Sequence, residues 1–158
     1  MGKRRSKTHA EFDDVLLHRT VDELNEYIKN SPWCLVVDWR QEEGSIVDDV
    51  AAMIPEAGLT HEWVDADRDM YITYRGRRYK AGLIWTGRDR YITLRKLNEV
   101  MGGDYELLVF RHTYGDDTHC FYLAPCDWWV ATERAFPSEI RRVFARITPR
   151  MDFPDYRG

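Results

Sequence analysis

The stretch DMYITYRGRRYKAGLIW, residues 69–85, decides how the middle of this chain folds. Aromatic and β-branched residues recur on both sides of the tripeptide Arg75-Gly76-Arg77, a pattern typical of two strands joined by a tight turn. It predicts a strand over residues 71–75 that pairs with a second strand over residues 78–85.

A second hairpin is predicted further along the chain. The run YELLVFRH (105–112) and the run THCFYL (118–123) are separated by a Gly- and Asp-rich turn at residues 114–117. A helix over residues 94–101 is expected between the hairpins, because Thr93 can cap its start and Gly102 can close its end.

The flanking sequence predicts further helices and strands. Residues 20–23 (TVDE) form a capping box that starts a helix ending before Pro32. The nearly all-apolar run at 33–39 predicts a strand covered on both faces. Further elements are expected as a helix at 46–54, a strand at 59–66, and two C-terminal helices, one at 128–136 and one from Ser138 to residue 147. The predicted class is α+β, with a mainly antiparallel sheet flanked by several helices.

The length of 158 residues suits one domain, which we place at residues 11–149. Residues 1–10 are expected to be a disordered basic tail, and residues 150–158 a loose C-terminal tail. No apolar run is long enough for a membrane-spanning helix, and the start of the chain lacks the apolar centre of a secretory signal. Three cysteines, an odd number, favour a reducing compartment, so the expected location is the cytoplasm.

Charge is strongly segregated along the chain, although the net charge is only −4. Residues 11–67 contain fifteen acidic and three basic residues, and residues 68–96 contain nine basic and two acidic residues. If the two blocks stay apart after folding, they create an oriented field that can steer a charged partner. If they face each other, they largely neutralise.

The acidic block contains the first candidate site, which would bind a basic protein. Carboxylates near an aromatic anchor can speed association with a basic surface, such as the substrate groove of a nuclease. The alternative is a solvated acidic surface that only maintains solubility. The candidate partner-binding residues are Trp39, Glu42, Glu43, Asp48, Asp49 and Glu56.

The basic block contains the second candidate site, for nucleic acid. Guanidinium groups on a β-hairpin suit phosphate contacts, and the neighbouring tyrosines could stack on bases. The acidic isoelectric point, near 5.7, argues against this function. The candidate nucleic-acid-binding residues are Arg75, Arg77, Arg78, Lys80, Arg88 and Arg90.

Catalytic and metal-binding functions have weaker support. His112, His119, Cys120 and Cys126 cluster around the second hairpin, but they lack the tight ligand pairs of structural zinc sites, so buried cysteines with a surface histidine pair are the preferred interpretation. Asp65, Asp67 and Asp69 imitate the start of a calcium loop whose later glycine and glutamate are missing, and we reject that site. No cofactor motif or catalytic motif is present. An uncharacterised hydrolase or metal enzyme stays open as a further alternative.

One internal similarity is notable. Residues 68–75 (RDMYITYR) and residues 88–95 (RDRYITLR) agree at six of eight positions. A single repeat of this length is too short for a solenoid, so we interpret it as a structural preference for the same residue types.

Four segments, at residues 94–100, 104–107, 116–121 and 125–129, resemble small bacterial immunity proteins that are encoded beside secreted polymorphic toxins. The resemblance covers about a quarter of the chain and implies a non-enzymatic, cytoplasmic inhibitor that binds one cognate toxin. Such families share no catalytic residues, so it assigns no site residue. Our first functional hypothesis is therefore an immunity-type inhibitor that uses its acidic half to cover a basic surface. The alternative is a nucleic-acid-binding accessory protein that uses the hairpin at residues 75–90.

Overall fold

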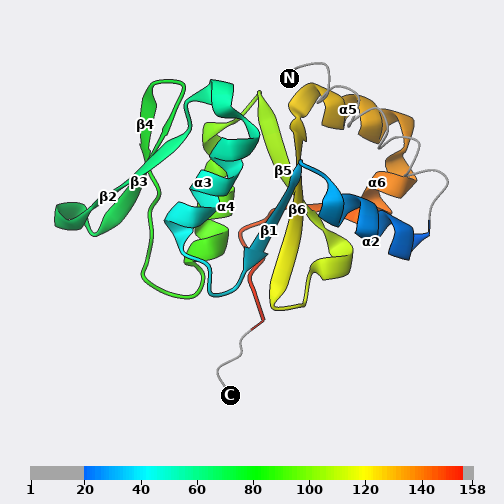
Figure 1. Cartoon of the computed structure of the whole chain (residues 1–158), viewed down its shortest axis with the longest axis horizontal. Coiled ribbons are helices and arrows are strands. Elements are labelled where there is room, and N and C mark those ends of the chain that lie inside the picture. Colours follow the sequence, from blue (N-terminus) through cyan, green and yellow to red (C-terminus); the bar gives the residue numbers. More distant parts are fainter. Residues whose placement is uncertain (1–19, 155–158) are drawn as a thin grey trace.

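Sheets and helices alternate in four layers in the computed structural model, which describes residues 20–154 and has an α+β fold (Figure 1). A three-stranded sheet lies at one end, followed by a helix layer, a four-stranded sheet and a second helix layer. All pairs of strands are antiparallel, which confirms the predicted fold class. Among residues 20–154, every helix is too short or too polar to span a lipid bilayer.

The four-stranded sheet forms the centre of the core, in the order β1-β6-β5-β7. Its strands are β1 (Cys34–Asp38), β5 (Tyr105–Phe110), β6 (Thr118–Pro125) and β7 (Phe144–Arg146). Helices α3 (Glu43–Met53) and α4 (Asp89–Val100) cover one face. Helices α2 (Val21–Asn30), α5 (Cys126–Ala135) and α6 (Pro137–Val143) lie on the other.

The three-stranded sheet contains β2 (Thr60–Val64), β3 (Asp69–Tyr74) and β4 (Arg77–Lys80), with β3 in the middle. Its inner face packs on α3 at Gly44, where a Cβ atom would lie 2.5 Å from Nε2 of His61. Nδ1 of the same ring lies 2.9 Å from Oδ1 of Asp48. The absence of a side chain at Gly44 therefore lets the histidine ring lie directly against the helix.

The predicted first hairpin is confirmed, but its second strand is shorter than expected. The strand β4 ends at Lys80 instead of residue 85, because backbone N–H groups of the following segment bond to side chains. The predicted helix after it begins at Asp89, five residues before the predicted start. Thr93 does not cap it: its hydroxyl donates to the carbonyl of Asp89 inside the helix (2.8 Å).

Other boundaries also differ from the predictions. Thr20 caps α2 as expected, accepting from the N–H of Glu23 (3.3 Å). The strand β1 is not covered on both faces, since Val36 is 46% exposed. Residues 144–146, predicted as helix, form the edge strand β7, because Phe144 adopts extended backbone angles and pairs with Phe110.

The C-terminal end of the domain lies beyond the predicted boundary at residue 149. Phe153 packs on the core and stacks on the ring of His119, with 4.1 Å between ring centroids. Residues 150–153 therefore belong with the domain and not with a loose tail. Residues 1–19 and 155–158, including the predicted basic tail at 1–10, lie outside the described residues.

Candidate functional site

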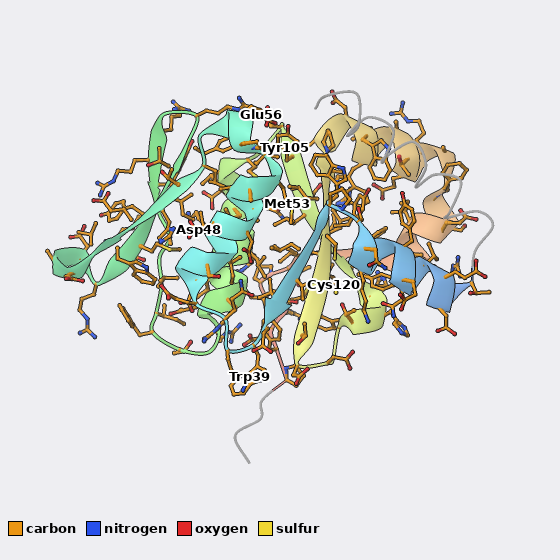
Figure 2. All side chains as sticks on the ribbon, viewed as in Figure 1. Trp39, Asp48, Met53, Glu56, Tyr105 and Cys120 are labelled. Atoms are coloured by element: carbon orange, nitrogen blue, oxygen red, sulfur yellow. The ribbon has the colours of Figure 1, made fainter. Side chains whose placement is uncertain are left out.

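The helix α3 and the segments at its two ends carry four of the predicted acidic residues, all of them exposed. Asp48 and Asp49 lie within the helix, Glu42 directly precedes it, and Glu56 lies in the short 3-10 helix Pro55–Ala57 that follows it. We call this surface the acidic ridge, and it consists of Glu42, Asp48, Asp49 and Glu56. In Figure 2, Asp48 lies near the middle of α3 and Glu56 beyond its C-terminal end.

Polar contacts fix three of the ridge carboxylates. Asp48 bonds to His61, as described above, and its side chain is still 64% exposed. Asp49 accepts from the side-chain amide of Gln41 (2.9 Å), and Glu56 accepts from the hydroxyl of Tyr105 (2.9 Å). Each contact leaves acceptor capacity on the carboxylate, because an ionised carboxylate offers about four lone-pair positions. The ridge therefore has a defined shape and keeps its negative charge at the surface.

Two of the predicted partner-binding residues are placed differently. Glu43 is turned inward: its side chain is 12% exposed and its Oε1 lies 3.6 Å from Nη1 of Arg90. Burial raises the pKa of Glu43, and the nearby charges of Asp89 and Glu42 act in the same direction. Trp39 is 37% exposed and lies at the end of β1, at the opposite end of α3 from Glu56 (Figure 2).

Ion pairs join the acidic and basic blocks at points outside the acidic ridge. Within residues 20–154, ion pairs between the blocks connect Glu43 to Arg90 (3.6 Å) and Glu62 to Arg78 (3.1 Å). Neither pair involves a carboxylate of the acidic ridge. The two blocks therefore meet at the N-terminal end of α3 and on the three-stranded sheet. The four residues of the acidic ridge are exposed.

The basic residues proposed for nucleic acid do not form one surface. Arg77 and Arg78 point to opposite faces of β4, because successive side chains of a strand alternate. Arg75 bonds to Oδ2 of Asp104 (2.9 Å) at the tip of the hairpin. The hydroxyl of Tyr74 and the guanidinium of Arg75 together lower the pKa of Asp104.

The remaining basic candidates face other elements. Nη2 of Arg88 donates to the carbonyl of Pro149 (3.3 Å), and Nε of Arg90 donates to the carbonyl of Gln41 (3.1 Å). On the outer face of the sheet, the guanidinium of Arg78 lies 3.8 Å from the ring centroid of Tyr71. Lys80, opposite Tyr71 in the β3–β4 pair, is exposed on the same face.

The histidine and cysteine residues around the second hairpin do not come together as ligands. The prediction of a surface histidine pair is wrong, because His119 is fully buried and shares a hydrogen bond with the hydroxyl of Tyr91 (2.7 Å), whereas His112 is exposed. Cys120 points to the opposite sheet face from His119. Among residues 20–154, no three His, Cys, Asp or Glu side chains are grouped so that they could hold a metal ion.

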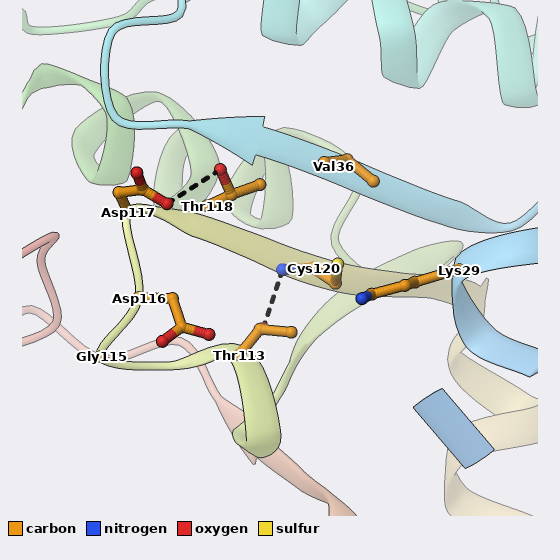
Figure 3. A pocket seen from close by; sticks show the side chains of 8 residues that line it. All are labelled: Lys29, Val36, Thr113, Gly115, Asp116, Asp117, Thr118 and Cys120. Atoms are coloured by element: carbon orange, nitrogen blue, oxygen red, sulfur yellow. Dashed lines mark hydrogen bonds between the residues drawn. The ribbon is translucent and has the colours of Figure 1, made fainter. Parts of the chain in front are cut away.

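A cavity of about 570 Å³ lies beside β1 and β6, and Cys120 is one of its lining residues (Figure 3). The backbone N–H of Cys120 donates to the hydroxyl of Thr113 (2.9 Å). A hydrogen bond from the neighbouring Cys34 lowers the pKa of the Cys120 thiol, and Lys29 acts in the same direction. The pKa of Cys34 is raised by the same interaction and by burial. The fold thus brings the thiols of Cys34 and Cys120 together, which their distant positions in the sequence did not indicate.

The residues that the sequence analysis missed lie in the loop between β4 and α4. Ile84 and Trp85 are 55% and 58% exposed, although residues 78–85 were predicted to be a strand. The available signal was the internal similarity, which places Asp69 and Asp89 at equivalent positions on the two sides of this loop. Both aspartates are buried, and their carboxylates accept backbone N–H groups of the loop.

The chain was compared with models of known protein families, with curated proteins and with solved structures, and none of these comparisons gives a match.

Proposed function

We propose that this protein is a non-enzymatic protein-binding module, an immunity-type inhibitor that covers a basic surface of a toxin with its acidic ridge. The observation that carries the proposal is the exposure of four carboxylates on α3 and at its two ends, those of Glu42, Asp48, Asp49 and Glu56. No Lys or Arg occurs in α3 itself, so the helix contributes only negative charge to this surface.

The electrostatic consequence supports an inhibitor more than a passive surface. Like charges along one face add their potentials, and such a surface accelerates encounter with a basic partner by about 10–10³-fold at low ionic strength. A nuclease or another toxin that acts on nucleic acid must expose a basic groove, so it offers the complementary charge. Because the ridge lies on a packed helix and on the segments directly joined to it, it needs little reorganisation to bind.

The experiment uses the protein encoded by the adjacent gene as the candidate partner. Association of the two purified proteins is followed by stopped-flow fluorescence at several salt concentrations. Cells that express the neighbour with and without this chain report protection. We expect a complex, protection of growth, and an association rate that falls as salt rises. A neighbour that neither binds nor harms the cell would contradict the immunity-type function.

Matched charge reversals test the ridge itself. The double variant Glu42→Lys/Asp49→Lys and the control Asp22→Lys/Glu26→Lys on α2 change the net charge equally. We expect the ridge variant to slow association about tenfold or more at low salt, and the control to have a much smaller effect. An equal effect of both variants would show that total charge, and not the ridge, controls the rate.

A second candidate function, nucleic-acid binding, has one favourable observation. Arg78, Lys80 and Tyr71 share the outer face of the three-stranded sheet, which no helix among the described residues covers (Figure 1). A gel shift with nonspecific DNA and RNA tests it, with Arg78→Gln/Lys80→Gln as the variant. Binding that weakens steeply with salt and is lost in this variant would support the sheet as a nucleic-acid surface.

A further inference from the structure

The loop between β4 and α4 is held by two buried carboxylates. Asp69 accepts the backbone N–H groups of Gly82 and Leu83, both at 3.0 Å. Asp89 accepts those of Ile84 and Trp85, both at 2.9 Å. Four consecutive N–H groups are thus bonded to side chains and not to a neighbouring strand. Buried carboxylates are costly unless they are fully hydrogen-bonded, so this loop has a strongly specified shape.

The loop uses this shape to present an exposed tryptophan. Trp85 has φ of 60°, in the left-handed region that non-glycine residues rarely adopt. Its indole N–H donates to the carbonyl of Arg68 (2.7 Å), and its ring lies 6.2 Å from that of Trp63. Backbone strain of this kind persists only where surrounding contacts impose it, and it concentrates at binding sites.

A cavity of about 290 Å³ lies between this loop and the start of α3. Its walls include the two indoles and Leu83, and its charged lining comes from Glu43, Asp89 and Arg90. Trp85 and Gly87 are exposed, so the cavity opens to solvent. Its volume is at the lower limit of ligand pockets, which suits one side chain better than a larger molecule.

The carboxylate of Glu43 keeps hydrogen-bonding capacity in this cavity besides the bond from its own backbone N–H. Asp89 is bonded to two backbone N–H groups, whereas the contact between Glu43 and Arg90, at 3.6 Å, is longer than a hydrogen bond. The formal charge of the three groups is −1. A largely buried carboxylate in a cavity that two indole rings also line favours a cation, because ring faces and carboxylates both attract positive charge.

We propose that this cavity accepts an arginine side chain of the protein partner, with its guanidinium against the indole rings that line it and bonded to Glu43. The inference rests on the proposed function, since a basic partner supplies such side chains. A planar guanidinium can stack on an indole and donate to a carboxylate at the same time, which an ammonium group does less well. Arg68 already lies with its guanidinium 5.9 Å from the ring of Trp85, which shows that this ring tolerates a neighbouring cation.

The test does not need the partner. Full-length protein is titrated with N-acetyl-arginine amide, and the indole N–H signals in ¹⁵N–¹H spectra are followed. N-acetyl-citrulline amide is the matched neutral probe, and N-acetyl-lysine amide tests the preference for guanidinium. We expect saturable shifts of the Trp63 and Trp85 signals with arginine, and affinity at least about tenfold weaker for citrulline and clearly weaker for lysine. The signal of Trp129, which is buried and bonded to the carbonyl of Glu106, should not move.

A carboxylate of the cavity and one on a distant helix provide the variant and its control. Glu43→Gln should weaken arginine binding about tenfold, whereas Glu26→Gln, at an exposed position of α2 outside the cavity, should leave it unchanged. If Glu43→Gln disturbs folding, Trp85→Leu removes one ring at the surface and should also weaken binding. The proposal is overturned if arginine and citrulline bind equally, if lysine equals arginine, or if no Trp63 or Trp85 signal shifts.

This outcome is separable from the test of the proposed function. If arginine binds but the protein encoded by the adjacent gene forms no complex, the cavity proposal is supported and the immunity-type function is contradicted. If the adjacent gene's product does form a complex, Glu43→Gln leaves its affinity unchanged and arginine does not bind, the immunity-type function is supported and the arginine site is contradicted.

Discussion

Residues 68–75 and 88–95 share six of eight amino acids, but the first segment contains the central strand β3 and the second starts the helix α4. Ile72 is fully buried in the strand, whereas Ile92 is only partly buried on the helix. The burial of the tyrosines differs in the opposite sense: Tyr71 in the strand is partly exposed, and Tyr91 in the helix is buried. The comparison teaches that the residues around a segment, and not its own propensity, select strand or helix here.

One role is nevertheless the same in both segments. Asp69 and Asp89 are both 4% exposed, and each accepts two consecutive N–H groups from the loop that joins the segments. The similarity therefore reflects a shared task at the two ends of one loop more than a shared secondary structure. Four predictions test how far this contrast extends.

The largest difference is expected between the isoleucines. Ile72→Ala should reduce the free energy of unfolding by about 2–5 kcal/mol, because it leaves a cavity in a fully buried site. Ile92→Ala should cost about 1 kcal/mol, because its partly exposed site loses less burial. Urea unfolding of both variants measures the difference. Equal losses would show that the two sites are packed alike.

The aspartates should behave alike. Asp69→Asn and Asp89→Asn each turn an acceptor oxygen into an NH₂ group that faces a backbone N–H, so each should cost about 1–3 kcal/mol. The neighbouring variants Arg68→Gln and Arg88→Gln, at exposed positions, are the controls and should change stability by less than about 1 kcal/mol. Chemical denaturation followed by tryptophan fluorescence gives both values. An Asp89→Asn variant with unchanged stability would contradict a shared role of the two aspartates.

The tyrosines should differ in the opposite sense to the isoleucines. Tyr91→Phe removes the hydroxyl bonded to buried His119 and should cost about 1–2 kcal/mol. Tyr71→Phe removes a bond to the exposed carboxylate of Asp67 and should cost less than about 0.5 kcal/mol. Unfolding curves of the two variants under one condition make the comparison. A larger loss for Tyr71→Phe would contradict this account.

The smallest effect concerns pH. Burial lowers the pKa of His119, the partner of Tyr91, so the unfolded chain binds the proton more readily than the folded protein. Stability from the neutral ring is therefore complete above the ordinary pKa of 6.5 and decreases as the pH falls below it. The unfolding free energy should decrease between pH 7 and pH 5, with a smaller slope in His119→Gln. His112→Gln, at an exposed position, should keep the wild-type slope.

The sequence was sufficient for the fold class and for the elements whose signals are local. The capping residue Thr20, the turn at Gly76 and the antiparallel hairpins depend on nearby residues, and they were predicted correctly. The start of α4 was missed because Thr93 looks like a cap, whereas the helix begins at Asp89, whose side chain accepts N–H groups from residues four and five positions earlier. The strand β7 was missed because its pairing partner Phe110 is distant in the chain.

For the candidate site too, features that depend on nearby residues were predictable, and features that depend on distant residues were not. Asp48 and Asp49 are the charged positions of a helix whose buried side is formed by Ile46, Val47 and Val50, so their exposure could be anticipated from the sequence. The inward turn of Glu43 could not, since it depends on Arg90, forty-seven residues away. The cavity beside Trp85 also needed the tertiary structure, because a tryptophan in an apolar run is typical of a buried strand.

Gly44 has a consequence for how the acidic surface behaves. Because the imidazole of His61 fills the place of a side chain there, moving α3 by one residue along its axis would bring Glu43 or Ser45 against the ring. The contact between Gly44 and His61 therefore blocks sliding of α3 along the three-stranded sheet by steric hindrance. A molecule that approaches this surface meets charges whose spacing is already set before contact.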